Sequence, residues 1–231
     1  MSLIQSNTKT TEPNKYRALF ISDTHLGAHQ CKAERLYNFL CENDAEKIYL
    51  IGDIIETAGM KRWPPYHDLV LKILCEKART GTEIVFIPGN HDSIFRYHIG
   101  QYGNLKILNH AYHQRLDGRT LLLIHGDETD MIRFEFLLWF IAKFERWSKI
   151  HLWEVLRRVC TSWVESHTLE YEDKIIKLTR STDLSGVVCG HIHYPKISER
   201  DGFLYLNCGD FTWHCSAICE TYDGKFELLY G

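Results

Sequence analysis

The chain has 231 residues, of which 45% are hydrophobic, so it can bury the core of one substantial domain. Its formal net charge of -3 gives no electrostatic drive toward nucleic acid, and we expect no nucleic-acid partner. It contains no run of about twenty uncharged apolar residues, so we expect no membrane-spanning helix. The polar stretch 1–15 lacks the apolar segment of a secretory signal. We therefore expect a cytoplasmic protein with a disordered lead-in over 1–15 and one domain over 16–231.

Cysteine usage agrees with this location. The eight cysteines include no Cys-x-x-Cys pair, and their spacing does not fit a thiolate zinc site. Several lie in apolar surroundings, as Cys189 does at the end of a predicted strand. We expect them to be small buried hydrophobic residues in a reducing compartment.

The first half of the chain alternates strand and helix. Short apolar runs predict strands over 18–22, 48–52 and 84–88. Apolar residues at helical spacing predict helices over about 31–43 and 67–80. This βαβαβ order predicts parallel strands joined by right-handed crossovers.

Shorter strands follow. The segment 105–124 predicts two or more strands with a hairpin at Asp117-Gly118. The closing segment 203–230 is strand-rich and turns at Asp223-Gly224. The expected fold class is α/β (α+β), with a core of two sheets flanked by helices.

An apolar insertion separates these parts. The stretch from Met131 to Trp163 is dense in aromatic and aliphatic side chains and contains no Pro or Gly, so we expect one or two helices there and another over about 165–180. Its apolar positions cover more than one helical stripe. Two explanations stay open. The helices could be wedged into the core or a dimer interface, or they could form an apolar lid that receives a lipid-like substrate or a membrane surface.

Metal-ligand residues follow five of the apolar runs. They occur in Asp23-Thr24-His25, Gly52-Asp53, Gly89-Asn90-His91-Asp92, His125-Gly126-Asp127 and Gly190-His191-Ile192-His193. Ligand-binding groups gather at the carboxyl ends of strands in open α/β sheets, so these clusters can converge on one point. Carboxylate, amide and imidazole groups suit Mn, Fe(II) or Zn, and Asp53 can bridge two ions. Two ions about 3.5–4 Å apart can activate one bridging hydroxide and neutralise phosphoryl oxygens.

This ordered set of motifs, spanning about 18–215, resembles the calcineurin-like metallophosphoesterase superfamily. The resemblance implies a four-layer sandwich of two mixed β-sheets flanked by helices. It also implies that one metal is bound by Asp23, His25, bridging Asp53 and His193, and the second by Asp53, Asn90, His125 and His191. His91 would face the substrate phosphate and stabilise charge or protonate the leaving oxygen. Asp92 would either orient His91 or cap main-chain N–H groups of the turn.

Within that superfamily, the motifs are similar to those of the UDP-2,3-diacylglucosamine pyrophosphatase branch. This implies hydrolysis of UDP-diacylglucosamine to UMP and a lipid 1-phosphate in lipid A biosynthesis, with manganese preferred over iron, zinc or magnesium. The insertion over about 130–180 would be a helical lipid-binding cap, in peripheral contact with the inner membrane surface. Two positions depart from the branch, because His91 replaces an Arg and Trp63 stands later than the usual Trp after Glu56. These departures are typical of a sister subgroup.

Other residues are weaker candidates. Arg96 could contact phosphate or be paired elsewhere. Aromatic residues of the insertion are candidate substrate contacts: Phe134, Trp139 and Trp147. Asp127 and Asp130 could hydrogen-bond the ligand imidazoles, and His214 could lie near the site.

Two other functions remain open from the sequence. A dinuclear phosphodiesterase or phosphatase could act on soluble nucleotides or phosphoproteins, with the insertion purely structural or forming a homo-oligomer. A binding scaffold without catalysis should have lost metal ligands, and none of the seven ligand positions is substituted.

Overall fold

The structure is a computed structural model that describes residues 12–57, 63–129, 161–181 and 183–231. Side chains of 161–165 are not part of that description. The helices predicted over 131–163, with Phe134, Trp139 and Trp147, lie almost wholly outside the described residues. No helix in the described part of the chain is long and apolar enough to cross a bilayer.

The first half has the predicted alternation. It runs through β1 (Asn14–Ile21), α1 (Ala33–Glu42), β2 (Asn43–Ile51), α2 (Pro65–Arg79) and β3 (Glu83–Ile87). β1 pairs with β2 and β2 with β3, both in parallel, which confirms the βαβαβ prediction. β1 starts at Asn14, so the last two residues of the predicted lead-in belong to the first strand.

The first sheet has seven strands in the order β12-β11-β1-β2-β3-β5-β4. One edge is formed by β4 (Gly100–Tyr102) and β5 (Leu105–Ile107), and the other by β11 (Ser216–Glu220) and β12 (Phe226–Tyr230). The turn at Asp223-Gly224 joins β11 to β12 as predicted, with Gly224 at a φ of 83°. β11 runs antiparallel to β1, so the sheet is mixed.

The second sheet has five strands in the order β6-β7-β8-β10-β9. They are β6 (Ala111–Gln114), β7 (Thr120–Leu123), β8 (Gly186–Cys189), β9 (Lys196–Arg200) and β10 (Phe203–Asn207). The hairpin predicted at Asp117-Gly118 joins β6 to β7. β7 and β8 pair in parallel while β9 and β10 pair antiparallel, so this sheet is mixed too.

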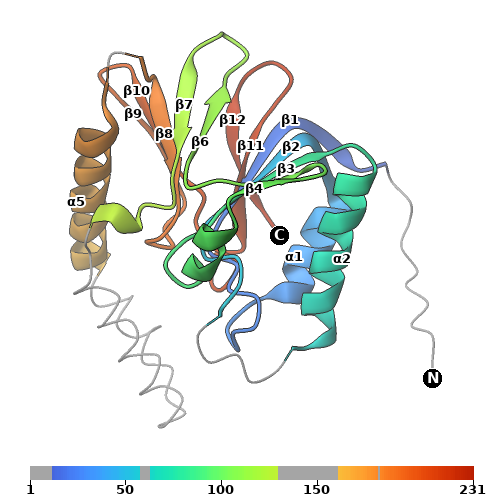
Figure 1. Cartoon of the computed structure of the whole chain (residues 1–231). Helices are drawn as coiled ribbons and strands as arrows, with labels where there is room; N and C mark the ends of the chain where they lie inside the picture. The colour runs from blue at the N-terminus through green and yellow to red at the C-terminus, as the bar shows by residue number, and fades with distance from the viewer. Residues whose placement is uncertain (1–11, 58–62, 130–160, 182) are drawn as a thin grey trace, which may run out of the picture.

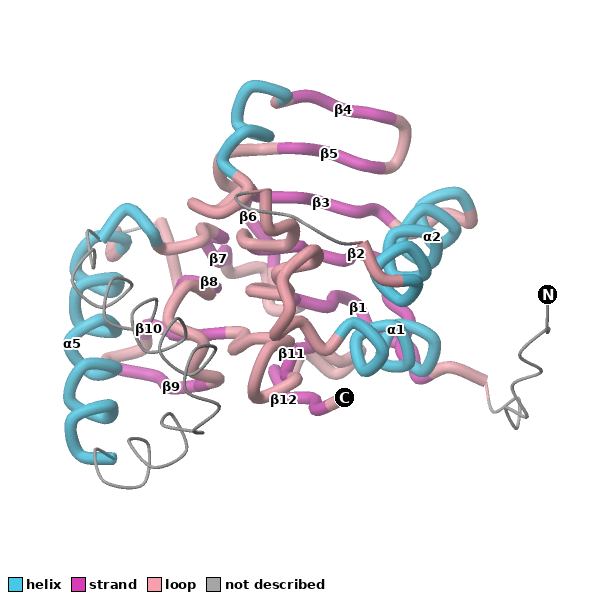
Figure 2. Tube along the Cα trace, turned by 90° about the horizontal axis from the view of Figure 1, so that it is seen from below, coloured by secondary structure: helices cyan, strands magenta, loops and turns pink. Residues whose placement is uncertain are grey.

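The sheets face each other, with α1 and α2 outside the first and α5 (Thr161–Thr179) outside the second (Figures 1 and 2). Alternating side chains of β1 build two of the three core layers. Leu19 and Ile21 pack toward the helices, whereas Ala18 and Phe20 pack between the sheets. A third layer lies between the second sheet and α5.

Cysteine burial follows the prediction only in part. Among the cysteines in the described residues, four are buried, namely Cys189, Cys208, Cys215 and Cys219, but Cys41 and Cys75 are exposed on α1 and α2. Those two lie on the solvent faces of amphipathic helices, where helical position decides exposure.

Candidate metal centre

The carboxyl ends of β1, β2, β3, β7 and β8 all carry the predicted ligand loops. Main-chain hydrogen bonds tie these loops together. The N–H of Asp23 donates to Gly52 O at 3.1 Å, and the N–H of His25 donates to Asp53 O at 2.9 Å. The N–H of Gly190 donates to His125 O at 3.1 Å and links the two loops of the second sheet. Strand order and pairing therefore bring the five motifs to one edge of the sandwich.

Backbone strain concentrates at the same residues. Seven non-glycine residues in the described part of the chain have positive φ, and five of them are predicted ligands: Asp23, His25, Asp53, His191 and His193. A left-handed conformation is unfavourable for residues with a side chain and clusters at functional sites. The turns therefore adopt an unfavourable backbone conformation, which directs these side chains toward the ligand cluster.

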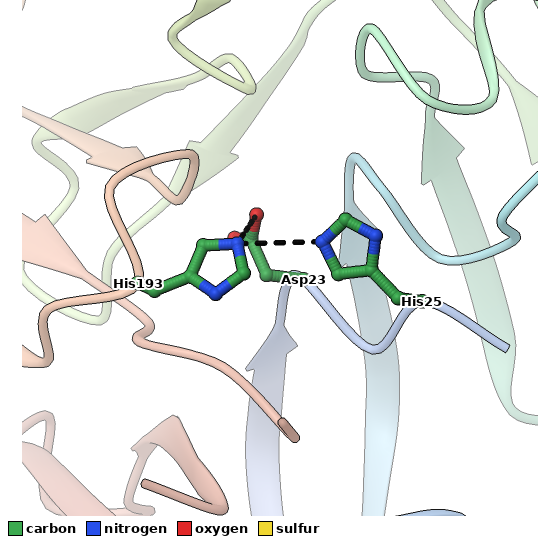
Figure 3. A group of neighbouring side chains, drawn as sticks. All are labelled: Asp23, His25 and His193. Atoms are coloured by element: carbon green, nitrogen blue, oxygen red, sulfur yellow. Dashed lines mark hydrogen bonds and ion pairs between the residues drawn. The ribbon is translucent and has the colours of Figure 1, made fainter. Parts of the chain in front are cut away.

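One ligand group joins the first and second sheets (Figure 3). The Nε2 atom of His193 lies 3.2 Å from Asp23 Oδ1 and 3.3 Å from His25 Nε2. Neighbouring donors around a tetrahedral ion with bonds of 2.0–2.1 Å stand about 3.3 Å apart. Two imidazole nitrogens and a carboxylate oxygen at this spacing fit a divalent cation.

A second group lies on the other side of Asp53. The Nε2 atom of His125 is 3.3 Å from Asp53 Oδ2 and 3.2 Å from Asn90 Oδ1. The ring of His191 stands 5.2 Å from the ring of His125. The same Asp53 oxygen is 3.9 Å from His25 Nε2, so it faces both groups. The donor set fits two ions that share one carboxylate.

Hydrogen bonds from the protein orient these donors. Asp23 Oδ2 accepts from the N–H of His191 at 2.9 Å and from Ser22 Oγ, while Asp53 Oδ1 accepts from the N–H of His91 at 2.8 Å. His125 Nδ1 lies 3.1 Å from Ile51 O, so Nδ1 carries the proton in a neutral ring and Nε2 then has the free lone pair. Each carboxylate uses one oxygen to hold a loop and keeps the other for the site.

The two buried carboxylates of the site, Asp23 and Asp53, favour positive charge beside them. Burial lowers the pKa of His193, but the Asp23 carboxylate outweighs it and raises this pKa to about 9. Burial raises the pKa of Asp53, but His125 outweighs it and holds the value below its ordinary range. Burial and then the neighbouring His125 lower the pKa of His191 to about 4. Buried carboxylates stabilised by nearby cationic groups are suited to hold metal ions in the same place.

His91 and Glu56 form a contact beside the two groups. Glu56 Oε2 lies 2.8 Å from His91 Nδ1 and 3.4 Å from His25 Nδ1. Burial raises the pKa of Glu56, but hydrogen bonds from His25 and His91 outweigh it and lower this pKa to about 2. The side chain of His91 is 38% exposed, so it is open to a ligand while its ring stays anchored.

Comparison with known proteins gives the family. Residues 16–195 match the family model described as calcineurin-like phosphoesterase, which is most of the chain. This chain is a calcineurin-like metallophosphoesterase. It is a member of a hydrolase family, and it carries His and Asp groups that can bind metal ions.

Distant relatives of this metallophosphoesterase share one name. A UDP-2,3-diacylglucosamine hydrolase of Shewanella piezotolerans is 23% identical, covering 93% of this chain and 99% of the relative. Another of that name, from Aliivibrio fischeri, is 29% identical over 92% of this chain and 97% of the relative. Among solved structures, a Thermotoga maritima protein matches at 18% identity and a TM-score of 0.49, covering 94% of this chain and 99% of that one. An E. coli phosphoesterase matches at 14% identity and a TM-score of 0.47, covering 92% and 97%.

Asp92 of the metallophosphoesterase anchors the turn before it. One carboxylate oxygen accepts from the N–H of Gly89 at 2.6 Å, and the other accepts from the N–H groups of Ile54 and Ile55 at 2.7 and 3.2 Å. This is the capping geometry that the sequence left open as one alternative. A catalytic role for Asp92 stays a prediction.

Some of the weaker candidate residues lie within the described part of the chain, and the others lie outside it. Arg96 Nη2 donates to Asp127 Oδ2 at 2.8 Å and to Pro88 O at 3.2 Å, so it is a paired arginine in this structure. His214 Nδ1 lies 2.7 Å from Asp210 Oδ2, and that carboxylate also accepts from Thr212 Oγ1. Thr212 Oγ1 is in turn 3.4 Å from His193 Nδ1, which links His214 to the site indirectly. Asp130 and the three aromatic candidates lie outside the described residues.

Two contributors were missed by sequence reasoning. Glu56 was noted only as part of a motif, although an acidic residue three positions after Asp53 was a usable signal. Tyr171 of α5 is fully buried, with its Oη 3.4 Å from both Gly126 O and Gly190 O. A Cβ on Gly126 would come within 1.9 Å of that hydroxyl. Nothing in the sequence marked Tyr171, because its role depends on how α5 packs.

Proposed function

We propose that this metallophosphoesterase is a dinuclear hydrolase that cleaves the pyrophosphate bond of a UDP-2,3-diacylglucosamine-like lipid nucleotide. The observation that carries the two-metal chemistry is the position of Asp53 Oδ2, 3.3 Å from His125 Nε2 and 3.9 Å from His25 Nε2. The observation that favours the substrate is the shared name of relatives that align over more than nine-tenths of this chain.

The proposed metal sites use the seven predicted ligands. One ion would be held by Asp23, His25, Asp53 and His193, and the other by Asp53, Asn90, His125 and His191. The donor set favours manganese, with iron, zinc or magnesium as alternatives. When bound, such a pair of ions lowers the pKa of water and neutralises phosphoryl oxygens.

The protein's own groups would complete the reaction. One carboxylate oxygen of Asp53 faces both ligand groups. Its other oxygen accepts a hydrogen bond from the main-chain N–H of His91. His91 presents Nε2 toward the site, 4.0 Å from Asp53 Oδ2, where it can stabilise phosphate charge or protonate the leaving oxygen. Recognition of the acyl chains by the insertion over about 130–180, and peripheral contact with the inner membrane surface from the cytoplasm, stay predictions.

The direct test uses purified full-length protein with Mn²⁺ and UDP-2,3-diacylglucosamine, with UMP release followed by chromatography. A parallel reaction with UDP-N-acetylglucosamine, which has the same pyrophosphate but no long acyl chains, measures the contribution of the lipid. We expect UMP from the acylated substrate at a much higher kcat/KM. Hydrolysis of bis-p-nitrophenyl phosphate without UMP release from the lipid nucleotide would contradict the substrate. Equal rates on both nucleotides would favour a soluble-nucleotide hydrolase.

A further inference from the structure

The hydroxyl of Tyr171 lies between two of the ligand loops. Tyr171 is fully buried on α5, and its Oη atom is 3.4 Å from Gly126 O and 3.4 Å from Gly190 O. Gly126 directly follows His125 on the loop after β7, and Gly190 directly precedes His191 on the loop after β8. A phenol hydroxyl has one proton to donate, so the two carbonyl oxygens share it. Tyr171 therefore connects both ligand loops of the second sheet to the helix outside that sheet.

The loop after β7 lies directly against this hydroxyl. A Cβ on Gly126 would come within 1.9 Å of Tyr171 Oη and 3.6 Å of Ile175 Cδ1. Gly126 also has a φ of 108°, which residues with a side chain rarely adopt. On the other loop, Gly190 O accepts a further hydrogen bond from Asn207 Nδ2 at 2.8 Å. The hydroxyl and the two carbonyls thus form one close-packed contact inside the protein.

The residue next to Tyr171 anchors the helix at this point. Glu172 is fully buried, and its carboxylate accepts hydrogen bonds from Lys196 Nζ at 2.7 Å and from Ser198 Oγ at 2.6 Å. Arg200 Nε lies 2.9 Å from the same carboxylate. All three partners belong to β9, so α5 is bonded to the second sheet directly beside the tyrosine. The position of the Tyr171 hydroxyl is therefore set by the fold.

A fixed hydroxyl at this point affects the distance between two proposed ligands. The rings of His125 and His191 stand 5.2 Å apart, and the ring of Tyr171 is 6.0 Å from that of His191. The two loops are also joined by the N–H of Gly190, which donates to His125 O at 3.1 Å. Loss of a donor to a buried carbonyl costs free energy, which favours a shift of the loop toward another donor. Such a shift would move the histidine beside that carbonyl.

We infer that Tyr171 is a positioning residue that sets the spacing of His125 and His191 through the main-chain carbonyls next to them. The inference rests on the proposed function for the role of the two histidines as ligands of one ion. It goes beyond that function because it gives α5, which carries none of the predicted ligands, a part in binding the metal. Loss of a group that supports metal ligands typically reduces metal affinity or activity by about 10- to 100-fold.

Tyr171→Phe tests the inference, since it removes the hydroxyl and keeps the ring, so the variant should fold. Tyr49→Phe is the matched control, because Tyr49 is also buried and its hydroxyl contacts His113 between the sheets at 3.1 Å. Urea denaturation of metal-free protein compares stability, and calorimetry measures Mn²⁺ affinity. We expect both variants to unfold at lower urea concentration than wild type, but only Tyr171→Phe to bind one Mn²⁺ about 10-fold more weakly. Wild-type Mn²⁺ affinity in Tyr171→Phe, or an equal loss of affinity in both variants, would overturn the inference.

Gly126→Ala probes the same contact from the loop. In the wild-type background its Cβ would overlap the Tyr171 hydroxyl, so we expect Mn²⁺ binding to weaken. In a Tyr171→Phe background the same substitution should weaken binding by a smaller factor, because the nearest atom that the Cβ meets has been removed. Equal factors in the two backgrounds would contradict the inference.

These measurements separate the inference from the proposed substrate. Calorimetry uses Mn²⁺ alone, so failure of the protein to release UMP from the lipid nucleotide leaves the comparison of variants unaffected. A wild-type protein that binds no Mn²⁺ would instead overturn the proposed function.

Discussion

The carboxylates of this site each perform two tasks with two oxygens. Asp23 and Asp53 hold a neighbouring loop through one oxygen and face the ligand cluster with the other. This division explains why both residues are fully or almost fully buried and why both adopt positive φ. A substitution at either residue should therefore affect metal binding and loop position together.

Asp53→Ala tests the bridging role. Both ligand groups lose a donor, so we expect both metal ions to be lost from purified protein and phosphodiesterase activity to fall more than about 100-fold, beyond the loss seen for a residue that only supports a ligand. Metal content by mass spectrometry and turnover of bis-p-nitrophenyl phosphate measure this. Asp68→Ala, which removes a half-exposed aspartate paired with Lys72, is the control. Retention of one ion at full occupancy would show that Asp53 serves a single site.

At the scale of elements, the ligand loops pass too close to one another for any side chain at certain glycines. A Cβ on Gly89 would lie 2.3 Å from Asp53 Oδ1, and one on Gly190 would lie 2.3 Å from Asp23 Oδ2. Glycine is needed at these positions because side chains of neighbouring loops occupy the space, including the Ser22 hydroxyl at 1.8 Å in the case of Gly190.

Gly89→Ala should displace the Asp53 carboxylate. Because overpacking costs about 1–3 kcal/mol, we expect a modest loss of stability together with a large loss of Mn²⁺ affinity. Gly100→Ala is the matched control, since its Cβ would meet its nearest neighbour, Tyr102, at 3.6 Å. Calorimetric Mn²⁺ titration and urea denaturation measure the two effects. Unchanged Mn²⁺ affinity in a folded Gly89→Ala protein would contradict the close-packing account.

Elements with a strong apolar pattern were predicted well, and their polar extensions were not. The three strands of the βαβαβ unit end within one residue of the predicted ends, but β1 and β2 start earlier because their polar first residues pair with each other, as Asn14 does with Asn43. β4 and β9 were missed, since both are short or polar edge strands whose existence depends on a neighbour. The ligand residues were recognisable from order and type, whereas the Glu56 contact required three loops to be placed in space.

At the scale of the molecule, a buried polar network joins the two sheets. Glu220 on β11 is fully buried and accepts from Arg17 at 2.7 Å, while His113 on β6 lies 2.8 Å away. His113 also contacts the hydroxyl of Tyr49 at 3.1 Å. Burial raises the pKa of Glu220, but His113, the N–H of Leu116 and Arg17 outweigh it and lower this pKa below its ordinary value.

Glu220→Gln tests this network through its pH dependence. A carboxyl group whose folded pKa is depressed stabilises the fold above its unfolded pKa of about 4.3, and this stabilisation is lost as the pH falls through the folded value. We expect the variant to be less stable than wild type by about 1–3 kcal/mol near pH 7, with a smaller difference near pH 3. Urea denaturation of metal-free protein at both pH values measures it, with exposed Glu199→Gln as control. A difference that does not shrink at acid pH would contradict the assignment.

The sandwich as a whole brings together residues that are far apart in the chain, such as His25 and His193, whose Nε2 atoms are 3.3 Å apart. The most direct test of the account is anomalous X-ray scattering from crystals of the protein grown with Mn²⁺. The account predicts two manganese peaks on opposite sides of Asp53, one beside Asp23, His25 and His193 and the other beside Asn90, His125 and His191. A single peak, or peaks away from Asp53, would contradict it.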